Sequence, residues 1–399
     1  MMKENKTKTI LVGVSGGIAA YKSAQLVSDL VKKGYDVHVI MTENATKFIA
    51  PLTFETLTKH KVSIDDFGPD TEYYVEHITL ARMADCFVIC PATANIIAKV
   101  VHGIADDMLS STFLAADCPK IICPAMNTYM LENPVTIDNL KLCEHYGYAL
   151  VESGEGYLAC GDSGKGRLAE LADVEEAIEV ALTTDKYLKG RQVVVSAGPT
   201  QEALDPVRYL SNHSSGKMGY AIAKVAARLG AEVVLVSGPS ALHKPKGMKV
   251  VDIKSAADMA ESVLNESTNA DVIIMAAAVA DYTPLEVADE KMKKKDGELF
   301  IPLKRTTDIL QTLGERKKEG QIIIGFAMET ENLLDNARAK LLKKNCDVIV
   351  ANSIRNENAG FKADTNLVTL LCKDGMKEYE LMDKEEVAVH LFEDCVRGR

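Results

Sequence analysis

The sequence lacks any apolar run that approaches the roughly 20 residues a membrane-spanning helix requires. Its first ten residues, MMKENKTKTI, carry charge but no apolar core of the kind that signal peptides have. The longest strong apolar run, Val272 to Ala280, lies between Asp271 and Asp281, which predicts a buried strand. We therefore expect a globular chain with no membrane partner.

Basic residues are fewer than acidic ones, with 46 Lys and Arg against 57 Asp and Glu and a net charge of −11. This negative field disfavours nucleic acids and anionic membranes as partners. An anionic ligand must therefore meet a local group of Lys and Arg side chains or the N-terminus of a helix. Proline is also scarce, at 12 residues, and 47% of the residues are hydrophobic, so we expect a sizeable core rather than wholesale disorder.

Paired cysteines are not indicated either. The nine Cys are an odd number, most lie in apolar stretches, and no secretion signal accompanies them. Neither Cys86 with Cys90 nor the other Cys residues show zinc-ligand spacing with a second Cys or His pair. We therefore expect reduced thiols in a cytoplasmic protein.

Short β-rich apolar runs alternate with helical patterns along most of the 399 residues, which is typical of βαβ units around a parallel sheet. At about 100–200 residues per domain, this length predicts two domains or three. The first half opens with a strand over 9–14, a Gly16-Gly17 turn, a helix to about Lys33 and a strand over 35–41. The other elements expected in the first half are strands at 86–90 and 120–123 and helices at 94–102 and 108–115.

A second α/β domain is predicted after a helix over 174–182. The run QVVVSAGPT (192–200) resembles the opening strand and turn of a new nucleotide-binding fold, which places a domain boundary near 184–190. We thus predict two tandem Rossmann-like domains, 1–187 and 188–399, each with a mostly parallel sheet flanked by helices. The later strands are expected at 232–236, 249–251, 272–275, 322–325 and 348–350.

Two segments follow neither the helical nor the strand period. Residues 152–170 contain five Gly among interspersed charges and are expected to form a mobile loop. Residues 288–300 include four Lys in five positions and are expected to form a solvated excursion between strands, unless a phosphate lies beneath them.

The turn Ser15-Gly16-Gly17 follows a strand and precedes a helix, so its N–H groups and the helix end can bind a phosphate. The turn lacks the full G-x-G-x-x-G spacing, and taken alone it fits a structural tight turn equally well. The stretch SSGKMG (214–219) is no Walker A loop, because Gly is absent four residues before the Gly-Lys pair and Met follows the Lys. A P-loop NTPase is therefore disfavoured.

Taken as an ordered set, longer motifs of both halves resemble those of a known family. The first half contains SGGIAAYK (15–22), EHITLAR (76–82), PATANIIAKVVHGIADDMLS (91–110), PAMN (124–127) and ACGDSGKGR (159–167). The second half contains AGPT (197–200), DPVRYLSNHSSGKMG (205–219), AAAVADY (276–282), EKMKKK (290–295), GFAMET (325–330) and AKLLKKNCD (339–347). Over nearly its whole length the chain resembles bifunctional phosphopantothenoylcysteine decarboxylase/phosphopantothenate–cysteine ligases, whose first half belongs to the homo-oligomeric flavin-containing Cys decarboxylases.

The resemblance implies that the first half converts 4′-phosphopantothenoylcysteine to 4′-phosphopantetheine with FMN as a transient acceptor of two electrons. His77 would orient the substrate or move a proton, Asn127 would bind the substrate carboxylate or carbonyl, and Cys160 would protonate the enethiolate. Without the motifs, a lone His at a helix start, such as His77, is more often a cap or a surface residue, and Asn127 would be a turn cap. The residues that would form the flavin pocket are Gly16, Gly17, Thr42, Thr93 and Asn95.

For the second half, the resemblance implies ligation of cysteine to 4′-phosphopantothenate through an acyl-cytidylate, with CTP and Mg2+. Activation is needed because a carboxylate and an amine otherwise form a salt. Asn212 would hold the acyl-cytidylate, and Arg208 would contact a phosphate. Lys340 and Lys344 would share a helical face, although either alone fits a solvated surface. The implied nucleotide-binding residues are Met275, Ala276, Ala277, Asp281, Lys291, Thr307, Asp308, Ile309, Leu310, Phe326, Lys340 and Lys344.

The sequence departs from the family at two places in the second half. Pro199 stands where many relatives carry Gly, and RTTDIL (305–310) replaces a stretch that often contains Asn-Pro. No residue pattern identifies the Mg2+ ligands or selects CTP over ATP. The resemblance further implies a homo-oligomer built on trimers, or a dodecamer.

Two alternatives to this enzyme remain: a non-catalytic flavoprotein that serves as an interaction module, and an NAD(P)-linked oxidoreductase. The presence of His77, Asn127 and Cys160 argues against the first alternative. The missing G-x-G-x-x-G argues against the second.

Overall fold

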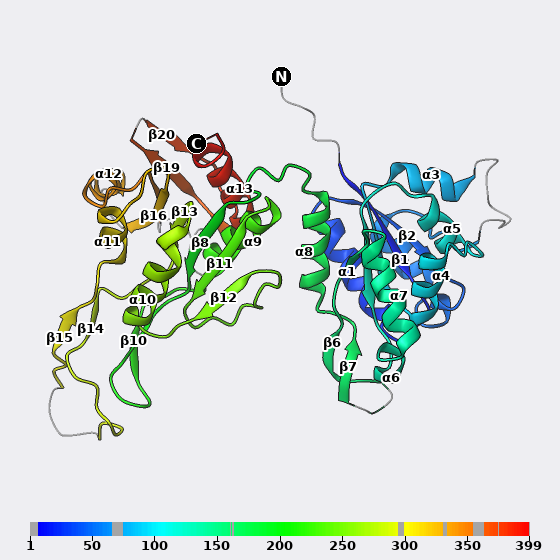
Figure 1. The fold of residues 1–399 in the computed structure, drawn as a ribbon, viewed down its shortest axis with the longest axis horizontal. Coiled ribbons are helices and arrows are strands. Elements are labelled where there is room, and N and C mark those ends of the chain that lie inside the picture. Colours follow the sequence, from blue (N-terminus) through cyan, green and yellow to red (C-terminus); the bar gives the residue numbers. More distant parts are fainter. Residues whose placement is uncertain are drawn as a thin grey trace. The chain divides into compact units, whose positions relative to one another are not determined.

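The computed structural model describes residues 7–65, 75–159, 161, 163–293, 299–329, 333–353, 363–373 and 375–398. The chain divides into two compact units, Met1–Thr184 and Asp185–Arg399, each with its own main sheet (Figure 1). Within the described part of the chain, no helix is both long and apolar enough to cross a membrane.

The main sheet of the first unit has five parallel strands in the order β2-β1-β3-β4-β5. Every residue of β1 is buried, because helices cover both faces of the sheet and the strand sequence is apolar throughout. Ile10 lies beside Val37 on one side and beside Cys86 on the other. The strands are β1 (Thr9–Val14), β2 (Asp36–Met41), β3 (Cys86–Ala92), β4 (Lys120–Pro124) and β5 (Ala149–Leu150).

Helices cover the two faces of this sheet. On one face, Leu26 and Leu30 of the first helix pack with Val12 and Phe54 in one apolar core. On the other face, Phe87 and Phe113 belong to a second core, and their ring centroids are 5.2 Å apart. The first face carries α1 (Ala20–Lys32), α2 (Pro51–Thr58) and α8 (Leu171–Leu182), and the second carries α3 (Glu76–Met83), α4 (Ala94–His102), α5 (Met108–Ala115) and α7 (Pro134–His145). Two short helices, η1 (Ala45–Lys47) and α6 (Thr128–Leu131), lie in connections.

The prediction of a mobile loop over 152–170 is wrong where the chain forms two paired strands. The chain there forms an antiparallel hairpin of β6 (Gly154–Tyr157) and β7 (Ser163–Arg167). Glu155 lies opposite Lys165 in the register, so residues whose charges suggested a loop stand on paired strands. Gly and charged residues show no alternation of apolar side chains, so the sequence pattern does not predict these strands. They are recognised only from the backbone pairing between β6 and β7.

The main sheet of the second unit has eight strands in the order β12-β11-β8-β13-β16-β17-β19-β20. The first six are parallel, and numbered along the chain they follow the doubly wound order 3-2-1-4-5-6. The last two run antiparallel. Their bounds are β8 (Gln192–Ala197), β11 (Glu232–Ser237), β12 (Lys249–Asp252), β13 (Val272–Met275), β16 (Ile322–Glu329), β17 (Val348–Ser353), β19 (Val368–Cys372) and β20 (Gly375–Glu378).

This sheet also has a separate apolar core on each face. Tyr220 and Ile222 pack with Leu391 and Phe392 on one face, whereas Met259 belongs to the core of the other. The first face carries α9 (Lys217–Arg228) and α13 (Lys384–Cys395), and the second carries α10 (Ala256–Glu266), α11 (Ile309–Glu315) and α12 (Leu333–Lys343). The smaller elements are η2 (Ser267–Asn269) and the pairs β9 (Gln201–Ala203) with β10 (Tyr209–Ser211), β14 (Tyr282–Pro284) with β15 (Leu303–Arg305), and β18 (Thr365–Asn366) with β21 (Met382–Asp383).

The predicted fold class, two α/β units with mostly parallel sheets flanked by helices, is confirmed. The apolar run from Val272 to Ala280 is a strand only in its first part, because β13 ends at Met275, the end predicted for this strand. Beyond it the chain leaves the sheet, and the Ala278 N–H donates to the Gly198 carbonyl at 2.9 Å. Asp281 therefore lies six positions past the strand end, in an irregular segment.

Candidate functional site

In the first unit, the ends of β1 and β3 meet where the strand order reverses direction. Such a switch point is the usual ligand site of a doubly wound sheet. The buried Ser15 hydroxyl donates to the Pro91 carbonyl at 2.7 Å and accepts from the Thr93 N–H at 3.0 Å. This side chain thus joins the turn after β1 to the start of α4.

The glycines of the turn after β1 differ in their surroundings. A Cβ on Gly16 would lie 2.4 Å from the Asn44 Cβ, so only glycine allows this approach of the turn to the segment after β2. A Cβ on Gly17 would meet only the Thr93 Cγ2 at 3.4 Å, an ordinary contact. Helix α1 follows at Ala20 with no acidic residue in its first turn, so its N-terminal N–H groups suit an anion.

A cavity of about 750 Å3, here called the first cavity, opens beside this turn. Met126 and Leu158 contribute apolar wall, and Asn127 lies at its rim as the N-cap of α6, accepting from the Tyr129 N–H at 2.9 Å. Apolar walls beside an anion-binding helix end fit a flavin, whose ring is aromatic and whose ribityl chain ends in phosphate. The lining consists of Gly16, Gly17, Ile18, Ala19, Tyr21, Lys22, Pro91, Thr93, Ala125, Met126, Asn127, Met130, Tyr157, Leu158, Ala159, Gly166, Arg167 and Leu168.

The hairpin of β6 and β7 forms part of this wall. The Met126 N–H donates to the Gly166 carbonyl at 3.0 Å, and a Cβ on Gly166 would lie 2.1 Å from the Met126 carbonyl oxygen. Gly166 has a φ of +119°, so both sterics and backbone conformation require glycine there. Leu158 and Ala159 of the hairpin line the cavity, whereas Cys160 lies outside the described residues.

The structure brings together some of the predicted residues of the first half and separates others. Gly16, Gly17, Thr93 and Asn127 line one cavity. Among the described residues, that lining does not include Thr42, whose hydroxyl accepts from the Ala45 N–H at 3.2 Å, nor the exposed Asn95. His77, the second residue of α3, is half-buried and also lies outside the lining.

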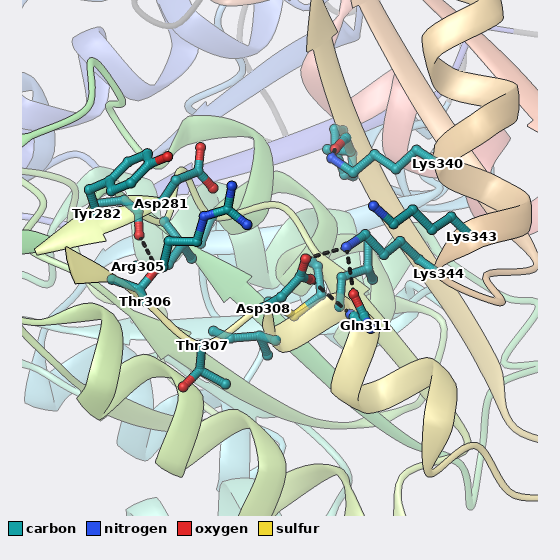
Figure 2. Close-up of a pocket in the computed structure, with 17 residues that line it drawn as sticks. Asp281, Tyr282, Arg305, Thr306, Thr307, Asp308, Gln311, Lys340, Lys343 and Lys344 are labelled. Carbon is teal, nitrogen blue, oxygen red and sulfur yellow. Dashed lines mark hydrogen bonds and ion pairs between the residues drawn. The ribbon is translucent and has the colours of Figure 1, made fainter.

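In the second unit, a pocket of about 610 Å3 lies beyond the ends of β13 and β16 (Figure 2). We call it the second pocket. Figure 2 shows Lys340, Lys343 and Lys344 extending from one side, with Asp281, Tyr282 and Arg305 on the other. The lining consists of Met275, Ala277, Val279, Ala280, Asp281, Tyr282, Arg305, Thr306, Thr307, Asp308, Ile309, Leu310, Gln311, Phe326, Lys340, Lys343 and Lys344.

Two lysines of this pocket are positioned by specific partners. The Lys340 ammonium donates to the Phe326 carbonyl at 2.8 Å. Lys344 forms an ion pair with Asp308 and donates to the Gln311 Oε1 at 3.2 Å. Burial raises the pKa of Asp308, but hydrogen bonds from Lys344 and the Gln311 N–H outweigh it, so the pKa lies below its usual value. The pocket therefore has a fixed cationic wall.

The second pocket contains every predicted nucleotide-binding residue except Ala276 and Lys291. The sequence did not predict seven other residues that line it: Val279, Ala280, Tyr282, Arg305, Thr306, Gln311 and Lys343. Lys343 precedes Lys344 in the motif AKLLKKNCD (339–347), so this motif could have predicted Lys343 as a pocket residue. Tyr282 and Arg305 meet only because β14 pairs with β15 across a long connection, which no local pattern shows.

Asn212 reaches this region through the backbone of the segment that follows β13. Its amide group donates to the carbonyls of Ala278 and Val279 at 3.3 and 3.1 Å. Val279 lines the second pocket, so Asn212 fixes one of its edges.

Arg208 has a different set of contacts. Its guanidinium pairs with the buried Asp205 at 2.6 Å and donates to the Met292 carbonyl at 2.5 Å. Burial raises the pKa of Asp205, but hydrogen bonds from the Val207 N–H, the Arg208 side chain and the Met292 N–H hold it far below its usual value. This pair therefore anchors the start of the lysine-rich segment, next to the exposed Lys291.

The chain is similar to known proteins over nearly its whole length. Residues 1–183 match the family model described as flavoprotein, and residues 188–397 match that described as DNA/pantothenate metabolism flavoprotein C-terminal domain. The coenzyme A biosynthesis bifunctional protein CoaBC of Bacillus subtilis (strain 168) is 49% identical over 391 residues, which are 97% of this chain and 96% of that protein.

Two further comparisons concern another activity and a solved structure. A cysteine/cysteine sulfinic acid decarboxylase from an unknown prokaryotic organism is 43% identical over 86% of this chain and 98% of its own length. A crystal structure of the C-terminal domain of a CoaBC protein is 47% identical, covers 52% of this chain and 95% of its own, and superposes with a TM-score of 0.45.

Proposed function

We propose that residues 1–187 form the decarboxylase and residues 188–399 form the ligase of this bifunctional enzyme. The chain belongs to the family of the coenzyme A biosynthesis bifunctional protein CoaBC and has both activities. The ligase joins cysteine to 4′-phosphopantothenate with CTP through an acyl-cytidylate. The decarboxylase then converts 4′-phosphopantothenoylcysteine to 4′-phosphopantetheine. The interaction-module and NAD(P) oxidoreductase alternatives are not favoured.

The chain is a flavoprotein, and FMN in the first cavity is our proposal for its flavin. The N-terminus of α1 and the Gly16-Gly17 turn would bind the phosphate, and the apolar wall would cover the ring. A bound flavin supplies a reversible acceptor for two electrons. The amide of Asn127 would bind the substrate carboxylate at the rim, and Cys160, which follows Ala159 in the sequence, would donate the proton that completes the product.

The position of His77 supports a site built from more than one copy of the chain. His77 is absent from the described lining of the first cavity, so a second copy would have to supply it. Large apolar side chains surround the cavity mouth in the single chain: Ile18 is 57% exposed, Tyr21 59% and Tyr157 76%. Exposed apolar groups rimming a cavity are typical of an interaction surface. We therefore propose a homo-oligomer built on trimers, or a dodecamer. We also propose that the enzyme is located in the cytoplasm.

In the second unit, CTP is proposed to bind in the second pocket. Lys340, Lys343, Lys344 and Arg305 would neutralise the triphosphate, and Phe326 would pack against the base or ribose. Mg2+ would enter with the nucleotide, held mainly by its phosphates. Asn212 would bind the acyl-cytidylate, and the lysine-rich segment that Arg208 and Asp205 anchor at Met292 would bring Lys291 to the phosphates.

The observation that carries this proposal is the gathering of the predicted nucleotide-binding residues around one cationic pocket. Lys344→Gln removes a cation but keeps an unbranched polar side chain, and we expect the KM for CTP to rise by about 10- to 100-fold, as for loss of a charged hydrogen bond. Lys249→Gln, which changes a surface pair with Glu266, is the matched control. Equal KM values for the two variants would show that CTP does not bind in this pocket. Faster turnover with ATP than with CTP would show that ATP is the nucleotide substrate.

The decarboxylase substrate needs its own measurement, because one relative is named for decarboxylation of free cysteine. We expect CO2 release from 4′-phosphopantothenoylcysteine and none from free cysteine or cysteine sulfinate. If CO2 is released only from the free amino acids, then free cysteine or cysteine sulfinate is the substrate in place of 4′-phosphopantothenoylcysteine.

A further inference from the structure

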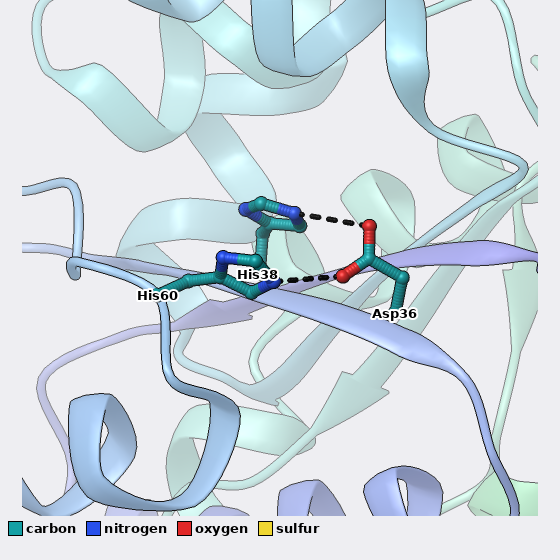
Figure 3. A group of neighbouring side chains, drawn as sticks. All are labelled: Asp36, His38 and His60. Atoms are coloured by element: carbon teal, nitrogen blue, oxygen red, sulfur yellow. Dashed lines mark hydrogen bonds and ion pairs between the residues drawn. The ribbon is translucent and has the colours of Figure 1, made fainter.

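Asp36, His38 and His60 form a cluster that neither proposed active site uses. The His60 Nε2 lies 2.8 Å from one oxygen of the Asp36 carboxylate, and the His38 Nε2 lies 3.3 Å from the other. Figure 3 shows both imidazoles facing this carboxylate. Their three ligand atoms all lie within 4.8 Å of one another.

The fold creates this cluster from two segments. Asp36 and His38 are two positions apart on β2, so both side chains project from the same face of this edge strand. Helix α2 ends at Thr58, and the C-cap residue Lys59 has a left-handed φ of 64°, which turns the chain back toward β2. Ser63 then joins β2 through backbone hydrogen bonds with Val39 and Met41, which places His60 over His38.

The cluster lies at the opposite end of β2 from the first cavity. Asp36 is the first residue of the strand, whereas Asn44, which contacts the glycine turn, follows its last residue, Met41. None of the three cluster residues lines the first cavity or the second pocket. A ligand at this position would therefore act independently of flavin and nucleotide.

The donor set is that of a transition-metal site. Two imidazole nitrogens and one carboxylate oxygen bind Zn2+ and similar divalent ions, with a water in the fourth position. Donors about 2.0–2.1 Å from a tetrahedral metal lie roughly 3.3 Å apart. The His60 Nε2 is 2.8 Å from one Asp36 oxygen and the His38 Nε2 is 3.3 Å from the other, and one ligand atom from each of the three residues lies within 4.8 Å of the other two, so a short inward movement brings the three donors to this separation. Solvent reaches the cluster, since the His60 side chain is 38% exposed and Asp36 34%.

One adjustment is required for a metal to bind. The two rings stack with centroids 3.9 Å apart and planes 16° apart, so their nitrogen lone pairs run nearly parallel. The rings must turn until both lone pairs converge on one point beside the carboxylate. His60 stands between a helix end and the strand-like segment at Ser63, and this position allows its ring to turn without moving β2.

We propose that Asp36, His38 and His60 bind one divalent transition-metal ion, of which Zn2+ is the probe, and that the ion fastens the segment after α2 to the edge strand β2. Such an ion stabilises the folded chain, because the unfolded chain does not hold the three ligands together. At a Zn2+ concentration about 100-fold above Kd, the expected rise in Tm is about 5–10 °C for a unit of this size.

The test uses the full chain without a histidine tag, treated with a chelator and titrated with ZnCl2 in a calorimeter. We expect one saturable site, and His60→Gln should weaken it by at least about 100-fold, since loss of even an outer partner of a metal ligand costs about 10–100-fold. His145→Gln, an exposed histidine of α7 in the same unit, should bind Zn2+ like the parent. The rise in Tm should disappear in His60→Gln and persist in His145→Gln.

Cysteine thiols are the main competing Zn2+ ligands, because eight of the described Cys residues carry thiols rather than disulfides. Titration with Co2+ separates the two kinds of site, since thiolate ligands give intense charge-transfer bands that nitrogen and oxygen ligands do not. Unchanged Zn2+ affinity in His60→Gln, thiolate bands with Co2+, or no saturable binding would each overturn the proposal. If His60→Gln has a lower Tm than the parent in chelator, Asp36→Asn is used as the test variant in its place. A Zn2+ affinity of Asp36→Asn equal to that of the parent would then overturn the proposal.

Discussion

Replacing Gly16 with Ala tests whether the turn after β1 is as closely packed as the structure indicates. The added Cβ would lie 2.4 Å from the Asn44 Cβ and 2.9 Å from the Asn44 carbonyl carbon, so the backbone of one of the two segments must move. Overpacking of this kind costs ~1–3 kcal/mol. At ~2–4 °C per kcal/mol for a unit of this size, the Tm of the flavin-free protein should fall by ~2–12 °C.

Gly17→Ala is the matched control for this substitution. Its Cβ would meet only the Thr93 Cγ2 at 3.4 Å, so the Tm of the flavin-free protein should stay within ~1 °C of the parent value. The assay is thermal unfolding of the two flavin-free variants, followed by the flavin absorbance each retains after addition of FMN. We expect Gly16→Ala to lose both stability and flavin, because movement of the turn displaces the phosphate-binding N–H groups. Equal Tm values for the two variants would refute this account of the turn.

Three further perturbations concern the second unit. Asn212→Asp replaces the amide that donates to the carbonyls of Ala278 and Val279 with a carboxylate that repels them, so cysteine ligation should fall while decarboxylation of added 4′-phosphopantothenoylcysteine continues; unchanged ligation would remove the assignment. The hydrogen bonds that lower the pKa of Asp205 stabilise the fold above the unfolded pKa of about 4, and this contribution is lost as the pH falls through the lower folded pKa. Asp205→Asn should therefore be less stable at pH 7 and show a shallower loss of stability in acid, measured by urea unfolding from pH 7 downward. Burial lowers the pKa of Lys384 to about 8, so the unfolded chain binds more protons above this pH and stability should rise as the pH increases from about 8 to 10; a Lys384→Met variant that keeps the same rise would contradict this.

The two main sheets were predictable because their strands are short apolar runs separated by helical patterns. The sequence predicts strands at 9–14 and 272–275, and the structure contains both with these bounds. The hairpin over 154–167 was not predictable, because Gly and charged residues give no period and pairing alone specifies it. The rest of the apolar run, Ala276 to Ala280, leaves the sheet and pairs with the turn after β8, which its composition does not show.

The candidate sites were predictable to different degrees. Motif residues such as Lys340 and Asp308 line one pocket, as their shared assignment to a nucleotide suggests. Arg208, which stays a predicted phosphate contact, also pairs with a buried carboxylate three positions earlier. That pairing depends on the burial of Asp205, which a single sequence does not reveal.

The order of residue types along the chain determined the α/β class, the glycine turn after the first strand and the motifs that indicate the two activities, because these depend on neighbours within a few positions. The tertiary structure decided which of the motif residues share a cavity, since this depends on strand order and on the close approach of distant segments. Asn44 against Gly16 and Met126 against Gly166 are examples, where chain segments tens of residues apart lie too close for a Cβ. The cluster of Asp36, His38 and His60 likewise exists only because the chain returns along β2, so its chemistry is a property of the fold.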